Sequence, residues 1–97
     1  MSLVLDALEG RRNSIAFRDL VDMVRESPNN ASRWVALIEK LRTQAATGNS
    51  HNYSERWHQE AWEVCKKAME TNPNNSKLKM YVEAYKQFLE VFDYSIK

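Results

Sequence analysis

The chain of 97 residues contains two histidines and one cysteine, the side chains that most readily suggest metal binding or nucleophilic catalysis. His51, His58 and Cys65 recur at seven-residue intervals. On one helix seven residues rise about 10.5 Å, whereas ligands bonded to one zinc ion at about 2.0–2.3 Å lie within a few ångströms of each other. The spacing therefore argues against a shared metal ion. We expect an exposed His51, a His58 packed on the flank of its helix and a Cys65 facing the core.

The same spacing keeps Cys65 from pairing with either histidine as an activated nucleophile, and no orienting group or glycine turn accompanies it. Gly10 and Gly48 are the only glycines, so a glycine-rich phosphate loop is absent from the sequence. We therefore expect no catalytic residue, no metal and no cofactor, and we predict that the protein is not an enzyme.

Charge and length limit the remaining classes of function. Fourteen basic residues stand against thirteen acidic ones, which leaves a net charge of +1 without a basic half. Nucleic acid is not expected as a direct ligand, because backbone binding needs a concentrated basic surface. One cysteine, no signal-peptide pattern in "MSLVLDALEG" and no run of about 18 apolar residues argue against secretion or a membrane span. We expect one domain, residues 1–97, in a reducing compartment, the nucleus or the cytoplasm.

Apolar residues recur at helical spacing in four segments, and two glycines and two prolines leave little room for hairpins of strands. Ser14 is a candidate N-cap for the first helix, which Pro28 ends. The expected second, third and fourth helices span residues 30–46, 54–71 and 76–94. Residues 3–9, "LVLDALE", are too few for a stable helix alone, and we expect one or two helical turns there that dock on an exposed apolar end of the others. The sequence therefore predicts an all-α fold.

Two stretches echo each other: "RESPNNASRWVALIEKL" from Arg25 and "METNPNNSKLKMYVEAY" from Met69. Pro28 corresponds to Pro73, and Trp34 corresponds to Leu78. Each copy reads as helix, "PNN" turn, helix, which is how stacked hairpins bury faces that neither helix buries alone. The pattern favours two units of antiparallel helices, about 14–46 and 54–94. The alternative is ordinary amphipathic helices joined by a common turn.

The first copy resembles the half-a-TPR repeat, a relative of the tetratricopeptide repeat, through a proline, a small-residue turn, an aromatic residue and an apolar–acidic pair: Pro28, Asn30, Trp34, Ile38 and Glu39. The second copy keeps Glu83 but has Leu78 where the aromatic residue is expected. The third predicted helix is similar to the first helix of that repeat through Val64, Lys67, Ala68, Met69 and Pro73. The resemblance covers residues 16–90 and implies a non-enzymatic scaffold, often dimeric, in complexes that process RNA.

The last predicted helix has more apolar surface than a terminal helix needs. Besides its main stripe it carries Met80, Ala84 and Val91, whereas one buried face suffices. We expect a partner protein, or a second copy in a homodimer, to bind there, because aromatic and methionine-rich patches are typical of interfaces. The alternative is burial within the chain, under residues 3–9. The predicted contact residues are Trp62, Met80, Tyr85, Phe88, Phe92 and Tyr94.

The expected function is therefore a protein-interaction scaffold or adaptor, placed in an RNA-processing complex by the resemblance. One alternative is a tetratricopeptide cochaperone that grips peptide termini, for which the sequence offers a set of polar side chains without showing that they converge: Arg18, Asn29, Arg33, Lys66 and Lys77. The other is an RNA-binding helical module whose rings stack on bases.

Overall fold

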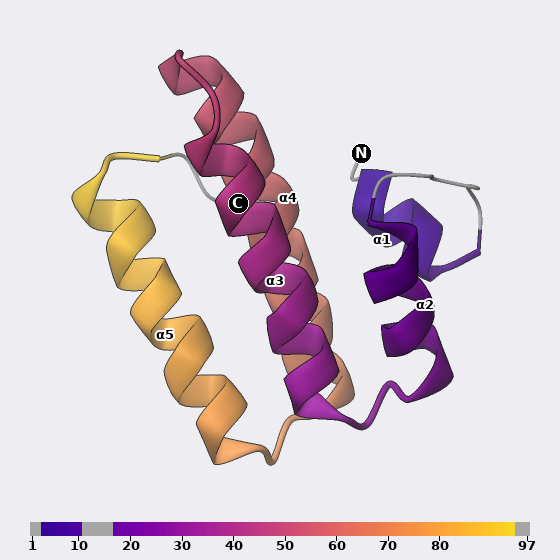
Figure 1. Ribbon diagram of the computed structural model, residues 1–97. Helices are drawn as coiled ribbons and strands as arrows, with labels where there is room; N and C mark the ends of the chain where they lie inside the picture. The colour runs from indigo at the N-terminus through magenta and orange to yellow at the C-terminus, as the bar shows by residue number, and fades with distance from the viewer. Residues whose placement is uncertain (1–2, 11–16, 95–97) are drawn as a thin grey trace.

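The computed structural model describes residues 3–10 and 17–94 and contains no strand in those ranges. Its helices are α1 (Leu3–Leu8), α2 (Arg18–Glu26), α3 (Ala31–Ala46), α4 (His51–Thr71) and α5 (Ser76–Val91). The predicted all-α fold is confirmed. Figure 1 shows α3 and α4 side by side and antiparallel in the middle, with α5 on one side of them and α1 and α2 on the other.

The repeated "PNN" turn has a physical role in both copies, because its last asparagine caps the helix that follows. The Oδ1 atom of Asn30 accepts the amide of Ser32 at 3.1 Å, and the Oδ1 atom of Asn75 accepts the amide of Leu78 at 2.9 Å. Each cap satisfies an amide that the first helical turn leaves without a partner. Because α4 runs back along the bundle between them in the chain, α3 and α5 start at the same end and run parallel (Figure 1).

Three helix boundaries differ from the sequence prediction. Helix α2 starts at Arg18 rather than directly after Ser14, because Phe17 adopts a left-handed conformation, with φ 59°. Helix α4 starts at His51 rather than near Ser54, because the hydroxyl of Ser50 accepts the amide of Tyr53 at 3.1 Å and caps the helix earlier. Helix α5 ends at Val91 rather than Tyr94, because Asp93 adopts a left-handed conformation, with φ 57°. The predicted cap at Ser14 lies outside the described residues.

The core lies mainly between α3 and α4, whose contact is the most extensive of any pair of helices in the described residues. Side chains with no exposed surface come from both helices: Leu37, Ile38, Leu41 and Ala45 from α3, and Ala61, Val64, Cys65 and Ala68 from α4. Helix α5 adds one buried stripe, Leu78, Val82, Tyr85 and Leu89. The most extensive contact, between α3 and α4, therefore joins the two predicted units. The helices within each unit, α2 with α3 and α4 with α5, contact each other less.

Helix α1 is fixed to the side of the bundle opposite α5. Both carboxylate oxygens of Glu60 on α4 accept backbone amides of α1, from Leu3 at 3.2 Å and from Val4 at 3.1 Å. Val4 and Ala7 are buried against the core, and α1 packs on α2 and α4. Residues 3–9 therefore do not cover the last helix, and the alternative of burial beneath them is wrong (Figure 1).

Candidate protein-interaction surface

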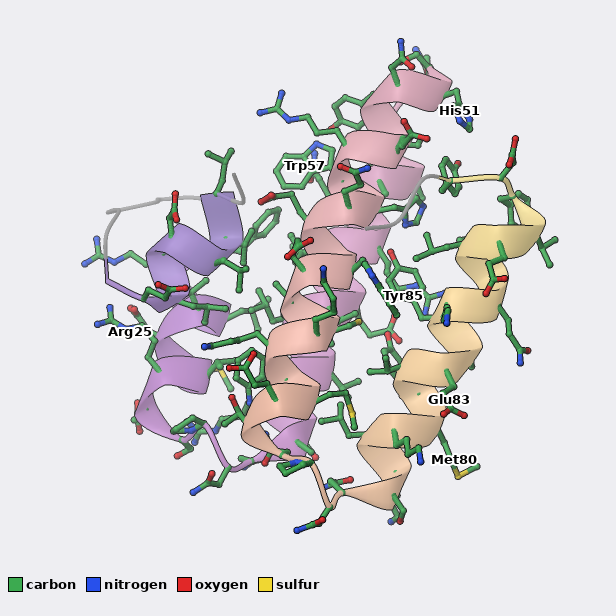
Figure 2. The ribbon with its side chains drawn as sticks, turned by 180° about the vertical axis from the view of Figure 1, so that it is seen from behind. Arg25, His51, Trp57, Met80, Glu83 and Tyr85 are labelled. Atoms are coloured by element: carbon green, nitrogen blue, oxygen red, sulfur yellow. The ribbon has the colours of Figure 1, made fainter. Side chains whose placement is uncertain are left out.

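Exposed apolar side chains gather on the outer edge of α5. Of the four large hydrophobic residues exposed in the described chain, three lie there: Met80 is 72% exposed, Val91 79% and Phe92 55%. Ala84 and Gln87 are also exposed and continue the row between Met80 and Val91. We call Met80, Ala84, Gln87, Val91 and Phe92 the α5 outer face. In Figure 2 the side chain of Met80 points away from the bundle, whereas Tyr85 lies on the side of α5 that faces α4.

The predicted contact residues divide between this face and the interior. Met80 and Phe92 lie on the α5 outer face, whereas Tyr85 is 1% exposed and is part of the core. Trp62 is half-buried on α4, with its ring centroid 6.5 Å from that of Tyr85. Phe88 and Tyr94 are half-buried as well. Only Met80 and Phe92 of this group are therefore exposed enough to anchor a partner without rearrangement.

Tyr94 is held by rings of α4. Its centroid lies 4.9 Å from His51 in a stacked arrangement and 4.6 Å from His58. Its backbone amide bonds to the carbonyl of Leu89 at 2.9 Å, which, with the left-handed Asp93, completes a Schellman cap on α5. The end of α5 is therefore attached to the start of α4.

A cluster beneath the α5 outer face joins α5 to α3 through Arg42. The guanidinium carbon lies 4.4 Å from the ring centroid of Tyr85, 5.2 Å from that of Phe88 and 5.9 Å from that of Tyr81. The guanidinium also donates to the hydroxyl of Tyr81 at 3.3 Å, and that hydroxyl donates to the carboxylate of Glu39 at 2.6 Å. These contacts fix the rotation of α5 and so the direction of its outer face.

This cluster was not predicted from the sequence. Tyr81, Tyr85 and Phe88 follow helical spacing, so their rings fall on one side of α5, and that signal was available. Nothing in the sequence indicated that Arg42, thirty-nine positions before Tyr81, would lie over those rings. The partner of the rings was therefore knowable only from the fold.

His58 and Cys65 are both buried, and burial disfavours the charged form of each side chain. The Nδ1 atom of His58 is hydrogen-bonded to the hydroxyl of Tyr85 at 2.6 Å. Burial and the nearby charge of Arg42 lower the pKa of His58 to about 4, so that the ring is neutral near pH 7. Burial raises the pKa of the Cys65 thiol to about 12, which removes the thiolate that nucleophilic chemistry needs.

The histidines and the cysteine do not converge on one point. The exposed His51 is near the carboxylate of Glu55, at 3.6 Å, and His58 faces Tyr85. Within residues 3–10 and 17–94, no group of three or more His, Cys, Asp or Glu side chains is placed to hold a metal ion. In the same ranges, no helix is long and apolar enough to cross a membrane.

A groove of about 970 Å³ separates the first turns of α3 and α5, and its apolar lining includes Val35, Leu78 and Tyr81. Of the polar side chains considered for a peptide clamp, Asn29 and Lys77 line this groove. The others have partners elsewhere: Arg18 with Asp22, Arg33 with Glu26 and the carbonyl of Met23, and Lys66 with Glu63. The described structure therefore does not assemble a five-residue clamp.

Comparison of the chain with protein-family models, with curated proteins and with solved structures gave no match. The function is therefore inferred from the exposed side chains of the α5 outer face.

The α5 outer face has the character of a binding surface. Its large apolar side chains lie at its two ends, with Ala84 and Gln87 between them, it is bordered by charged residues along the same helix, and the Arg42 cluster contacts the buried side of that helix. Contiguous exposed apolar surface on a small domain is typical of an interaction site, because exposure to water costs free energy that a partner recovers.

Proposed function

We propose that the protein is a non-enzymatic interaction module, a scaffold or adaptor that binds another protein through the α5 outer face. The observation that carries this proposal is the concentration of Met80, Val91 and Phe92 on one edge of the bundle. The opposite edge is covered by α1, whose Val4 and Ala7 are buried. The two ends of the helical stack therefore differ: within residues 3–10 and 17–94, three of the four exposed large hydrophobic side chains lie at the α5 end, and the fourth is Met23 on α2.

The attachment of α5 to the bundle supports the proposal. A surface that is already ordered loses less conformational entropy on binding than one that folds on contact. Helix α5 is anchored by Leu78, Val82 and Leu89 in the core and by the rings around Arg42. Apolar side chains on such a helix can therefore act as anchors in the way that interface hot spots do.

The cellular setting is proposed from the sequence resemblance alone. Pro28, Asn30, Trp34, Ile38 and Glu39 match the half-a-TPR pattern, and the scaffolds with that repeat act in complexes that process RNA. On this basis we place the protein in such a complex, in the nucleus or the cytoplasm. The resemblance adds a setting to the proposal, whereas the choice of surface depends on exposure.

Site-specific photocrosslinking tests the proposal. A photoreactive residue replaces Met80 or Val91, and a matched control replaces Asp22, a 57% exposed side chain on α2 far from α5. We expect crosslinked products from the two α5 positions that the Asp22 position does not give. The substitutions Met80→Asp and Val91→Asp should abolish the same products while the circular dichroism spectrum stays helical. Equal products from all three positions, or none from α5, would refute the proposed surface.

A second candidate, a short-peptide receptor, is favoured by the groove between the first turns of α3 and α5. Val35 and Tyr81 give it an apolar wall, and Lys77 supplies a cation. Substitution Val35→Glu would then block binding and leave the α5 crosslinks intact. Under the first candidate, Val35→Glu leaves binding unchanged.

A further inference from the structure

Helix α5 carries its charges in the order that its own dipole disfavours. Lys77 and Lys79 lie in its first turn, Glu90 lies in its last turn, and Asp93 follows it. The first turn contains no acidic residue and the last turn no basic one. A helix is positive at its N-terminus and negative at its C-terminus, so acidic residues first and basic residues last would stabilise it. The stability of α5 by itself therefore does not explain the order.

The charged side chains of α5 have no ion partner in the described parts of the chain. Lys77, Lys79, Glu83, Lys86 and Glu90 are all exposed. The ion pairs found within residues 3–10 and 17–94 involve other residues. These charges therefore remain free to meet a partner.

Reversal of α5 brings each of its cations to within one residue of the level of an anion. The order along the helix is Lys77, Lys79, Glu83, Lys86, Glu90 and Asp93. When a second α5 lies antiparallel, with the midpoints aligned between Ala84 and Tyr85, Lys79 reaches the level of Glu90, and Lys77 reaches the level of Phe92, one residue before Asp93. Glu83 in turn reaches the level of Lys86. A parallel copy would bring like charges to the same levels.

The dipoles of the two helices agree with this arrangement. In an antiparallel pair, the negative end of one helix lies beside Lys77 and Lys79 of the other, and the positive end lies beside Glu90 and Asp93. Each copy thus relieves the unfavourable order of charges in its partner. The apolar Met80 and Val91 lie on either side of the midpoint, so the same two-fold axis brings each toward the Val91 or Met80 of the other copy.

We propose that two copies of the chain associate through the α5 outer face, with the two α5 helices antiparallel about a two-fold axis near Ala84. This inference rests on the proposed function and names the partner. A two-fold contact of one surface with itself closes the assembly at a dimer. A head-to-tail chain would need a complementary apolar edge at the other end of the bundle, and there α1 covers the core.

The contact is small, so the dimer should be weak. Helix α5 has 16 residues and is therefore about 24 Å long. One helix edge of that length buries less than the roughly 800 Å² per partner of a standard interface, and such contacts are typically transient. We expect dissociation constants of about 10–100 μM, in the range where electrostatic complementarity selects the partner.

Charge exchange between variants tests the proposal. The acidic variant carries Lys77→Glu and Lys79→Glu, and the basic variant carries Glu90→Lys and Asp93→Asn. Asparagine tolerates the left-handed backbone of residue 93, where φ is 57°. Both variants give α5 the charge order that its dipole favours, so loss of association cannot be ascribed to a weakened helix.

Sedimentation equilibrium of the 11.4 kDa chain supplies the measurement, from about 10 μM to 1 mM at low salt. We expect the wild-type chain to dimerise and each variant alone to associate at least about ten-fold more weakly. An equimolar mixture of the two variants should recover heterodimers, because opposite charges again share most levels. Addition of about 1 M salt should weaken the wild-type dimer, since it screens exposed charges.

The outcomes separate this inference from the function on which it depends. A wild-type chain that stays monomeric, while photocrosslinks from Met80 join it to a different protein, overturns the dimer and leaves the interaction module in place. A dimer that both variants form as well as the wild type overturns the antiparallel α5 contact, since the interface then lies elsewhere. Monomers without specific crosslinks overturn both.

Discussion

Replacement of His58 by asparagine is expected to flatten the dependence of stability on pH between pH 6.5 and about 4, the ordinary and the folded-state pKa of this histidine. The ring is 5% exposed and is packed against Tyr85, Phe88 and Tyr94, with Arg42 as the nearby cation. Protonation places a second positive charge in this buried site. The unfolded chain accepts the same proton in water, without that penalty.

The sign and size of the effect follow from the two pKa values. Between pH 6.5 and about 4 the unfolded state binds more protons at this histidine than the folded state does. Stability therefore rises with pH across the window and is lost as the pH falls through it. The full shift in the pKa of His58 corresponds to a free energy of about 3 kcal/mol, at about 1.4 kcal/mol per pKa unit. Because solvent near the open edge of the cluster screens part of the charge, we expect a loss of about 2 kcal/mol.

Urea unfolding at pH 7.0 and pH 4.5, followed by circular dichroism, measures the effect. Asparagine is the matched substitution, since its side-chain amide can occupy the place of Nδ1 beside the Tyr85 hydroxyl and does not titrate. The carboxylates titrate equally in the wild type and in His58→Asn, so their contribution to the loss of stability cancels in the comparison. We expect the wild type to lose about 2 kcal/mol more than His58→Asn on acidification. Equal losses would show that the burial of His58 does not disfavour its charged form, and the reasoning would be refuted.

Three further substitutions test the local structure by urea unfolding. Asp93→Gly should raise the free energy of unfolding by about 0.5–1 kcal/mol, because glycine adopts φ 57° without a steric penalty; unchanged or lower stability would contradict the left-handed cap. Glu60→Ala should cost about 1–2 kcal/mol and speed amide exchange at the start of α1, whose two amides the carboxylate accepts; protected amides in the variant would contradict that role. Gly48→Ala should destabilise by about 1–3 kcal/mol, since a Cβ at residue 48 would lie 1.9 Å from the ring of Tyr53, and an unaffected variant would show that the ring moves freely aside.

The parts of the fold that depend on local chemistry can be predicted from the sequence, although the caps in the "PNN" turns were not. The second asparagine of each "PNN" turn, Asn30 and Asn75, is a cap because its side chain reaches an amide two or three residues ahead. The buried stripe of α5 also follows from spacing alone. The same spacing places Tyr85 in that stripe, at 1% exposure, so its selection as a contact residue gave too much weight to residue type and too little to position.

Other parts of the site depend on contacts that span the chain. The carboxylate of Glu60 reaches amides 56 and 57 positions earlier, and this contact decides that α1 covers the side away from α5. Arg42 meets the rings of α5 across 39 positions. No local pattern contains such pairings, because they arise only when the helices have packed. The sequence therefore located the apolar excess of α5 but left open whether α1 would cover it.

The two ends of the helical stack differ in how far their apolar side chains are covered, and this difference favours binding at α5. A helical stack needs a polar outer surface on its terminal helices to remain in water. At the α1 end this is achieved, since Val4 and Ala7 face inward and a buried carboxylate satisfies the first amides of the helix. At the α5 end Met80 and Val91 remain 72% and 79% exposed. A helix whose outer face combines such residues with charges that oppose its own dipole is poorly suited to face water alone, and it is well suited to meet a second helix of complementary order.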